Sequence, residues 1–532
     1  MDIESKNERQ IVTLSQEARK AIAQKDWSVV EEKANYILQI EDENAEGLFL
    51  LGFMNKIKGN IDIAIQLFER AVNSEKTRYD IAIELANLYS KNRKNEEAAT
   101  ILQQYEKYIN DSSLYSNIAG SIYVEIGLPQ KAFHLFKRAN EIQPNVDVIQ
   151  ANLAACSVYV GEIDNAKQIY RNLLDRFPAH QRNHYQLSRL TKAKDNEHVI
   201  LMKNILKKSN MSPEKNIFLY YAIGKELEDL ECWDESFKYY EMGGNAVSSV
   251  IKYDVREDIG IVEKIISECN QNWMKENELK HSEASSDPTP IFIVGLPRTG
   301  STLTERILSS HSDVQTIGET LFFHLALFNN AGIKNRNEMN LKNLESIFNV
   351  KPHEVAKTYI DKISYRLDNS SYFVEKMPLN FLYVGFIAAA WPEAKIIHLR
   401  RSPMDTCFSM YKQLFTFDYK YSYSLKDLGK YYISYCKMVE HWKSILGKRF
   451  IDIDYESMVS DPVVETRNLL KSLDLNFEEA CLDFHQNSTP STTASSVQVR
   501  QKIYSTSVNR WENYSEYLCE LKKYLCQNGI DA

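Results

Sequence analysis

The sequence lacks long apolar runs and paired cysteines, and each absence excludes a class of protein. No segment of about 18 uninterrupted apolar residues occurs, so we expect no membrane span. The opening stretch MDIESKNERQ has neither the basic start nor the apolar centre of an export signal. The chain holds 8 cysteines without CxxC spacing, which argues against a disulfide framework and a zinc site. We therefore expect a cytoplasmic protein with reduced thiols and no bound metal.

An excess of positive charge is also missing. The net charge of −8 excludes nucleic acid as a partner of the chain as a whole, although it allows a local basic pocket. A chain of 532 residues is too long for one ordinary core, so we expect at least two domains.

The first half of the chain contains an internal repeat. An alanine recurs every 34 residues, at Ala64, Ala98, Ala132 and Ala166. A larger residue four positions later keeps this interval, at Phe68, Leu102, Phe136 and Tyr170. The pattern, clearest in GLPQKAFHLFKRANEIQPN, resembles the tetratricopeptide repeat, in which small residues let paired helices approach closely. We expect an all-α solenoid over residues 10–275 whose surface binds a partner.

A weaker copy of the repeat, CWDESFKYYEMGGNA, puts Ser236 and Tyr240 two residues out of phase with the array. The polar stretch HSEASSDPTP then predicts a linker, placed at residues 276–289.

The remaining residues, 290–532, predict an α/β domain. PIFIVGL, AKIIHLRR and RFIDIDYESM have the character of short strands, and STLTERILSSH and PMDTCFSMYKQLF have helical spacing. Such alternation predicts a mostly parallel sheet with ligands beyond the carboxyl ends of its strands.

The turn after the first of these strands, GLPRTGST, has the spacing of a phosphate-binding loop. Backbone N–H groups and the start of the next helix would cradle an anion. The lysine expected after Gly300 is replaced by Ser301, and no acidic magnesium ligand is evident. Arg298 supplies a cation inside the loop instead. These features favour one phosphate that carries a further anionic group; a P-loop kinase or NTPase is the rival interpretation, and it predicts a lysine at position 301.

A second loop, HLRRSPMDTCFSMYK, begins a capped helix. Ser402 is the expected N-cap, followed by Pro403 and by Asp405 two positions further on. Arg401 before the cap and Ser409 two turns later could bind a second anion.

Two anion sites about a hundred residues apart on such a sheet resemble the sulfotransferase family, whose donor is 3′-phosphoadenosine 5′-phosphosulfate (PAPS). More closely, the chain is similar to bacterial proteins that fuse tetratricopeptide repeats to a sulfotransferase domain, and through them to the tyrosylprotein sulfotransferases. The resemblance implies a P-loop-like domain with Glu319 as the catalytic base and with Lys376 and Arg298 as groups that stabilise the transition state. The residues that the resemblance implies for donor binding are Arg298, Thr299, Gly300, Ser301, Thr302, Leu303, Arg401, Ser409, Tyr455, Asn509, Arg510 and Trp511.

Two positions depart from the family pattern. Asn509 stands where the tyrosylprotein enzymes have a serine that contacts the sulfate. Gln413, with Lys412 beside it, stands where they have a second arginine for the 3′-phosphate.

The expected activity is transfer of a sulfuryl group to an acceptor hydroxyl, with protein tyrosine as the favoured acceptor. A glycan or small-molecule acceptor stays open, as does a non-catalytic nucleotide-binding scaffold. The acceptor would be a protein, peptide or glycan, with the repeat array as a candidate surface for it. We interpret His311 and His398 as structural.

Overall fold

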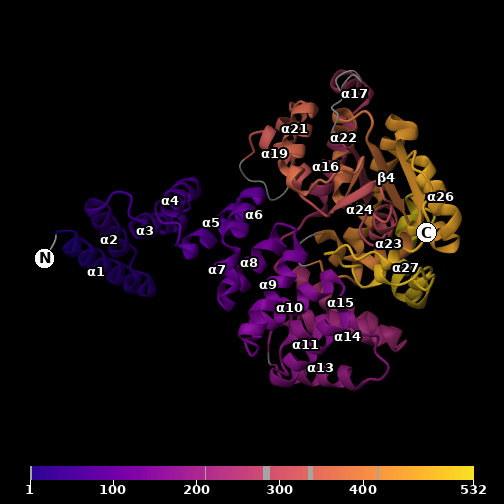
Figure 1. Ribbon diagram of the computed structural model, residues 1–532. Coiled ribbons are helices and arrows are strands. Elements are labelled where there is room, and N and C mark those ends of the chain that lie inside the picture. Colours follow the sequence, from indigo (N-terminus) through magenta and orange to yellow (C-terminus); the bar gives the residue numbers. More distant parts are fainter. Residues whose placement is uncertain (1–2, 210, 279–287, 334–338, 416–418) are drawn as a thin grey trace. The chain divides into compact units, whose positions relative to one another are not determined.

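The computed structural model describes residues 3–209, 211–278, 288–333, 339–415 and 419–532 (Figure 1). The predicted linker lies largely outside these residues. The chain divides into two compact units, Met1–Val160 and Gly161–Ala532. Within the described residues, no helix combines the length and the apolar character needed to cross a membrane.

The first unit consists of helices that each pack on the next. They are α1 (Ile3–Gln24), α2 (Trp27–Ile40), α3 (Ala45–Ile57), α4 (Ile61–Ser74), α5 (Tyr79–Lys91), α6 (Asn95–Gln104), α7 (Glu106–Asn110), α8 (Ser113–Glu125), α9 (Pro129–Ile142) and α10 (Asp147–Val160).

The repeated small residues hold the helices of each pair together. Ala64, Ala98 and Ala132 are fully buried, as close helix packing requires. Glycines on the preceding helices face the recurrent aromatic residues: a Cβ at Gly52 would lie 2.6 Å from the Phe68 ring. The 34-residue pattern therefore marks the buried seam of each pair.

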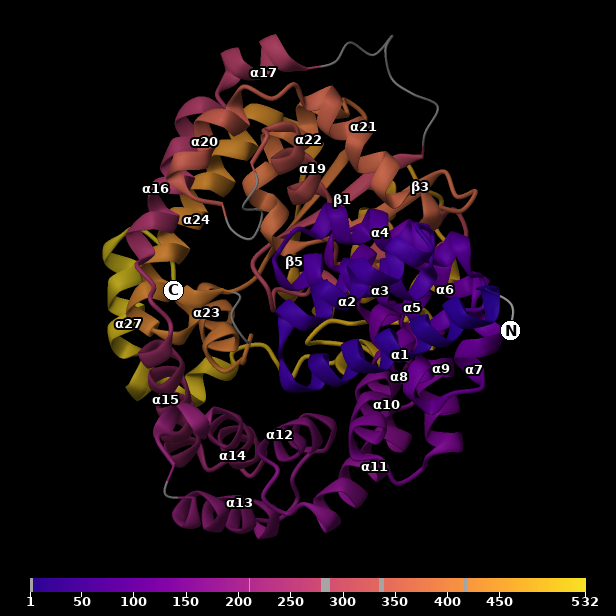
Figure 2. The same cartoon turned by 90° about the vertical axis from the view of Figure 1, so that its left-hand side faces the viewer.

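The second unit begins with further helices, and Figure 2 shows α12 to α15 in succession. They are α11 (Ile163–Arg176), α12 (Gln181–Leu190), α13 (Glu197–Lys208), α14 (Ile217–Asp229), α15 (Trp233–Val250), α16 (Val255–Glu268) and α17 (Gln271–Asn277). The weaker repeat copy lies in α15, which packs on α14. A Cβ at Gly224 would lie 3.0 Å from the Tyr240 ring, so this pair has the same glycine–aromatic seam as its predecessors.

A parallel sheet with strand order β2-β3-β1-β4-β5 follows. Its strands are β1 (Thr289–Gly295), β2 (Val314–Gly318), β3 (Tyr372–Lys376), β4 (Lys395–Arg400) and β5 (Phe450–Asp454). The helices of this part are α18 (Ser301–Leu308), α19 (Phe322–Asn330), α20 (Leu341–Phe348), α21 (Pro352–Ile363), α22 (Val384–Ala390), α23 (Pro403–Tyr411), α24 (Leu425–Leu446), α25 (Tyr455–Ser460), α26 (Pro462–Ser472) and α27 (Ser515–Gln527).

Successive residues of the central strand enter different cores. Phe292 and Val294 belong to a large apolar cluster, whereas Ile291 and Ile293 belong to a smaller one that includes Leu308 of α18. A strand buried on both faces carries a continuous apolar run, which is the pattern that predicted β1.

The predicted fold class is confirmed: a helical tetratricopeptide region is followed by a parallel α/β domain. Strands β2 and β3 were not predicted from the sequence. β3 ends in Glu375 and Lys376, whose charges indicate a surface position, yet both side chains are fully buried against tertiary partners.

Candidate functional site

The loop between β1 and α18 has the backbone conformation of an anion cradle. Arg298 and Gly300 both have positive φ angles, 70° and 97°. Gly300 lies against the Tyr455 ring, where a Cβ would come within 2.5 Å of Cδ2. Ser301 and Thr302 begin the helix and are buried, at its positively polarised end. Position 300 therefore requires glycine, because a side chain there would combine an unfavourable positive φ with a clash against the Tyr455 ring.

Arg401 joins this loop to the second predicted anion site. Its Nη1 donates to the carbonyl oxygen of Arg298 at 2.9 Å and lies 3.4 Å from the Ser409 hydroxyl. The Tyr455 ring stacks on its guanidinium, with the centroid 4.9 Å away. The structure thus brings together five of the predicted donor-binding residues, from the loops after β1 and β4, from α23 and from the start of α25.

The charges of these residues suit an anionic ligand. Arg401 is buried, and its Nε has no hydrogen-bond partner among the described residues. Burial, and then the charge of Arg401, lower the pKa of Arg298. An anion between the two arginines would relieve their repulsion and satisfy the free donor, so these residues fit a phosphorylated nucleotide.

A carboxyl-terminal segment covers the loop and supplies hydroxyl groups that were not predicted from the sequence. Ser495 accepts a hydrogen bond from Arg298, and Gln498 accepts another at 3.0 Å. The Thr493 hydroxyl lies 3.3 Å from that of Thr302. The hydroxyl-rich stretch 488–496 was the available signal, but only the fold brings it to the loop.

The same segment is tied to α23 through the buried carboxylate of Asp405. This group accepts from the backbone N–H of Asn509 at 2.7 Å and from that of Trp511 at 3.1 Å. The Trp511 ring lies 4.8 Å from the ammonium of Lys522 on α27. In this arrangement the backbone of Asn509 and Trp511 shapes the site, while the side chain of Asn509 is exposed.

The other predicted donor-binding residues contact groups of the protein itself. The Thr299 hydroxyl donates to the carbonyl oxygen of Leu296 at 2.8 Å, which closes the turn. Leu303 packs against the smaller apolar cluster. Arg510 forms an ion pair with Glu228 of α14 at 2.6 Å.

The two other predicted catalytic residues meet beyond the ends of β2 and β3. Lys376 donates to the carboxylate of Glu319, which is 35% exposed, whereas Lys376 is fully buried. Glu305 of α18, which was not predicted, lies 3.7 Å from the Lys376 ammonium and accepts from Thr316 at 2.7 Å. Glu305 thereby connects α18, the helix after the predicted anion-binding loop, to the predicted catalytic pair.

A second buried carboxyl, Glu375, stands beside this pair. It accepts hydrogen bonds from Tyr359 and from Thr320 at 2.8 Å, and Thr320 directly follows Glu319 in the chain. Burial raises the pKa of Glu375 to about 7, against the opposing effect of these hydrogen bonds. Burial therefore outweighs the hydrogen bonds and the charge of Arg366, which favour the ionised carboxylate.

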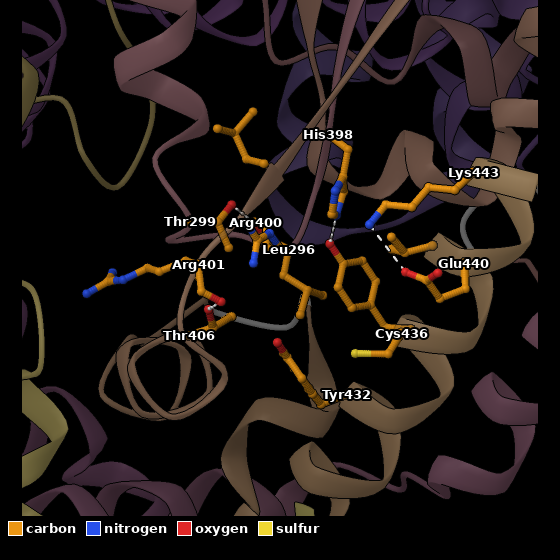
Figure 3. Close-up of a pocket in the computed structure, with 13 residues that line it drawn as sticks. Leu296, Thr299, His398, Arg400, Arg401, Thr406, Tyr432, Cys436, Glu440 and Lys443 are labelled. Carbon is orange, nitrogen blue, oxygen red and sulfur yellow. Dashed lines mark hydrogen bonds and ion pairs between the residues drawn. The ribbon is translucent and has the colours of Figure 1, made fainter. Parts of the chain in front are cut away.

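A pocket of about 100 Å³ lies between α24 and the loop that follows β1 (Figure 3). His398 points into it and contacts Tyr435 and Asp452, the latter at 2.6 Å. Burial lowers the pKa of His398. Thr299 and Arg401 also line this pocket, but the Arg401 side chain extends away from His398 (Figure 3).

Both ring nitrogens of His311 contact backbone groups, as expected for a structural role. Its Nε2 lies 3.0 Å from the carbonyl oxygen of Asn476, and its Nδ1 accepts from the backbone N–H of Asp313 at 3.1 Å. Among the side chains described, no group of three or more histidines, cysteines and acidic residues could hold a metal ion.

Two families match parts of the chain. Residues 290–479 match the sulfotransferase family, and residues 57–122 match the tetratricopeptide repeat.

Individual relatives match longer or shorter parts of the chain. An uncharacterised protein of Aquifex aeolicus is 27% identical over 428 residues, which are 78% of this chain and 55% of that protein. A protein-tyrosine sulfotransferase of Drosophila melanogaster is 24% identical over 260 residues, or 47% of this chain and 50% of that enzyme. The chain therefore spans about half the length of these curated relatives.

Among solved structures, the sulfotransferase domain of the Synechococcus PCC 7002 olefin synthase is 18% identical to the chain, with a TM-score of 0.32. The match covers 44% of this chain and 91% of that domain.

Proposed function

Since the chain is a sulfotransferase-family protein with tetratricopeptide repeats, we propose that it transfers the sulfuryl group of PAPS to the hydroxyl of an acceptor. The observation that carries the proposal is the hydrogen bond from Arg401 to the Arg298 carbonyl, at 2.9 Å. It brings the residues proposed for the two anion sites into contact, which supports a donor that carries both a 5′-phosphosulfate and a 3′-phosphate.

The two proposed sites would bind different groups of the donor, the 5′-phosphosulfate and the 3′-phosphate. The loop around Gly300 and the start of α18 would hold the 5′-phosphosulfate, with Arg298 and Ser495 beside it. Arg401 and Ser409 would hold the 3′-phosphate. The bound donor supplies an activated sulfuryl group, and the chain's part is to position it and to balance its charge.

Glu319 would act as the general base, because it is the exposed member of a pair whose lysine is buried. It takes the proton of the acceptor hydroxyl as the acceptor oxygen bonds to sulfur. The bond from sulfur to the 5′-phosphate oxygen breaks, and adenosine 3′,5′-bisphosphate leaves. Lys376 and Arg298 would stabilise the charge that develops on the transferred group and the leaving oxygen.

Protein tyrosine is the acceptor we propose. A phenol gives up its proton more readily than a sugar alcohol does, which suits a carboxylate base. The similarity to the Drosophila protein-tyrosine sulfotransferase also supports this choice. We further propose a cytoplasmic location and a peptide-binding role for the repeats.

The test is transfer of radiolabelled sulfate from PAPS to tyrosine-containing peptides, compared with serine peptides and glycans. We expect labelling of tyrosine and a rate at least about 100-fold lower in Glu319→Gln, because a general base contributes that much. Glu319→Gln should still bind adenosine 3′,5′-bisphosphate, which distinguishes lost catalysis from lost folding. Equal rates in both proteins would exclude Glu319 as the base.

A further inference from the structure

Repeat helices of the second unit contact the donor-binding cluster directly. Glu228, near the carboxyl end of α14, is 8% exposed and lies among groups of the sulfotransferase domain. Its Oε1 accepts from Lys412 at 2.7 Å and from Arg510 at 2.6 Å. One carboxylate from the array thus holds two cations that are about a hundred residues apart in the chain.

Both cations belong to the segments that form the predicted 3′-phosphate site. Lys412 caps the carboxyl end of α23, three residues after Ser409, and residues at this spacing are neighbours on a helix. Arg510 lies between Asn509 and Trp511, whose backbone N–H groups donate to Asp405 of α23. The other guanidinium of this site, Arg401, donates to the carbonyl oxygen of Ser507 at 2.6 Å.

The electrostatics of this cluster depend on the carboxylate from the array. Burial raises the pKa of Glu228, but the charges and hydrogen bonds of Lys412 and Arg510 outweigh it and lower the pKa to about 2. Burial lowers the pKa of Lys412, and the charges of Arg510 and Arg298 act in the same direction. Without Glu228, the positive charges of Lys412, Arg510 and Arg298 would repel one another in a partly buried space.

Other side chains of the array support the same region. Arg189 of α12 donates to the carbonyl oxygen of Ala494 at 3.3 Å, next to Ser495. The Ser236 hydroxyl of α15 lies 3.1 Å from that of Tyr514, which follows Arg510 by one helical turn. The repeat helices therefore contact the segment that covers the loop near both of its ends, at Ala494 and at Tyr514.

We propose that Glu228 is a positioning residue that the repeat array contributes to the donor site: by binding Lys412 and Arg510 together, it creates the preference for a 3′-phosphate. The inference rests on the proposed function, because it concerns how that donor is recognised. It makes the last repeats a part of donor recognition in addition to any role in binding an acceptor.

The experiment measures the affinities of the full chain for adenosine 3′,5′-bisphosphate and adenosine 5′-phosphate by calorimetry. The ratio of the two affinities isolates the contribution of the 3′-phosphate. We expect Glu228→Gln to lower this ratio on the order of 10-fold, while the affinity for adenosine 5′-phosphate changes little. A purely structural role would lower both affinities together and leave the ratio unchanged.

Glu226→Gln is the matched control. Glu226 lies on the same helix, is 2% exposed and accepts from His198 at 2.7 Å, away from the donor site. It should alter stability without altering the ratio. Lys412→Met is the second variant: it keeps the Glu228–Arg510 pair, so it should fold, and it should also lower the ratio.

An unchanged ratio in either Glu228→Gln or Lys412→Met would overturn the inference while leaving the proposed function intact. A wild-type protein that binds both nucleotides equally would overturn the proposed function, and the inference with it.

Discussion

At the scale of single residues, the site is built from charged groups whose partners are fixed by the fold. The sequence alone indicated Arg298, Arg401, Glu319 and Lys376, because these residues stand at motif positions. It could not indicate Ser495, whose contact with Arg298 spans 197 positions. The spacing of a motif predicts local structure. The contact between Arg298 and Ser495 depends instead on the tertiary fold, which brings two distant segments together.

The buried Glu375 predicts an unusual pH dependence of stability. Its folded-state pKa of about 7 lies above the ordinary value of 4.5. The native state therefore binds the proton more tightly than the unfolded chain, and this stabilisation is lost as the pH rises through 7. We expect wild-type stability to fall by roughly 3 kcal/mol between pH 4.5 and pH 8 from this group.

Thermal unfolding of wild type and Glu375→Gln at pH 5 and pH 8 checks this prediction. The glutamine cannot ionise, so its melting temperature should fall less than that of wild type between these pH values. Equal losses in the two proteins would show that Glu375 is not the titrating group.

At the scale of elements, the sequence predicted the structure where a repeat, a continuous apolar run or a set of capping residues marks an element locally. The 34-residue period, β1, β4 and α23 with its Ser402 cap were predicted in this way. β3 was missed because its last two residues are charged and their burial depends on Tyr359, Thr320 and Glu319. Local sequence carries no information about partners so far away.

The segment from the end of β1 to α18 has positive φ angles at Gly295, Arg298 and Gly300. Gly300→Ala should abolish measurable binding of adenosine 3′,5′-bisphosphate, for two reasons. A positive φ costs an alanine about 1–2 kcal/mol. The new Cβ would also displace Tyr455, which packs on Arg401, so both anion sites would be disturbed.

Gly529→Ala is the control for backbone strain alone. Gly529 has a φ of 81°, a Cβ added there would meet no atom within 4 Å, and the residue lies near the end of the chain. This variant should lose some stability and keep nucleotide affinity. Undiminished binding in Gly300→Ala would mean that the loop does not hold the nucleotide.

At the scale of the whole molecule, the compact units do not follow the domains that composition predicts. The sequence places a boundary at residues 276–289, whereas the contacts divide the chain between Val160 and Gly161. The last repeats pack with the α/β domain through Glu228 and Ser236, contacts that no repeat pattern reveals. The domain boundary predicted at residues 276–289 can be tested against the division at residue 160.

Two truncated chains distinguish these boundaries. Residues 161–532 should bind adenosine 3′,5′-bisphosphate about as well as the full chain, because they contain all the donor-site residues named above. Residues 288–532 lack Glu228 and the helices that pack on the covering segment, so they should bind it at least about 10-fold more weakly or fail to fold. Equal binding by both fragments would show that the last repeats are dispensable for the donor.

The central claim is that two arginines, one in the loop after β1 and one after β4, bind the two phosphates of a single donor nucleotide. Calorimetric titration of the full chain with adenosine 3′,5′-bisphosphate and with ATP, repeated with Arg401→Ala, tests it most directly. The account predicts that wild type binds the bisphosphate much more tightly than ATP and that Arg401→Ala loses this preference. Tighter binding of ATP, or a preference for the bisphosphate that survives in Arg401→Ala, would contradict it.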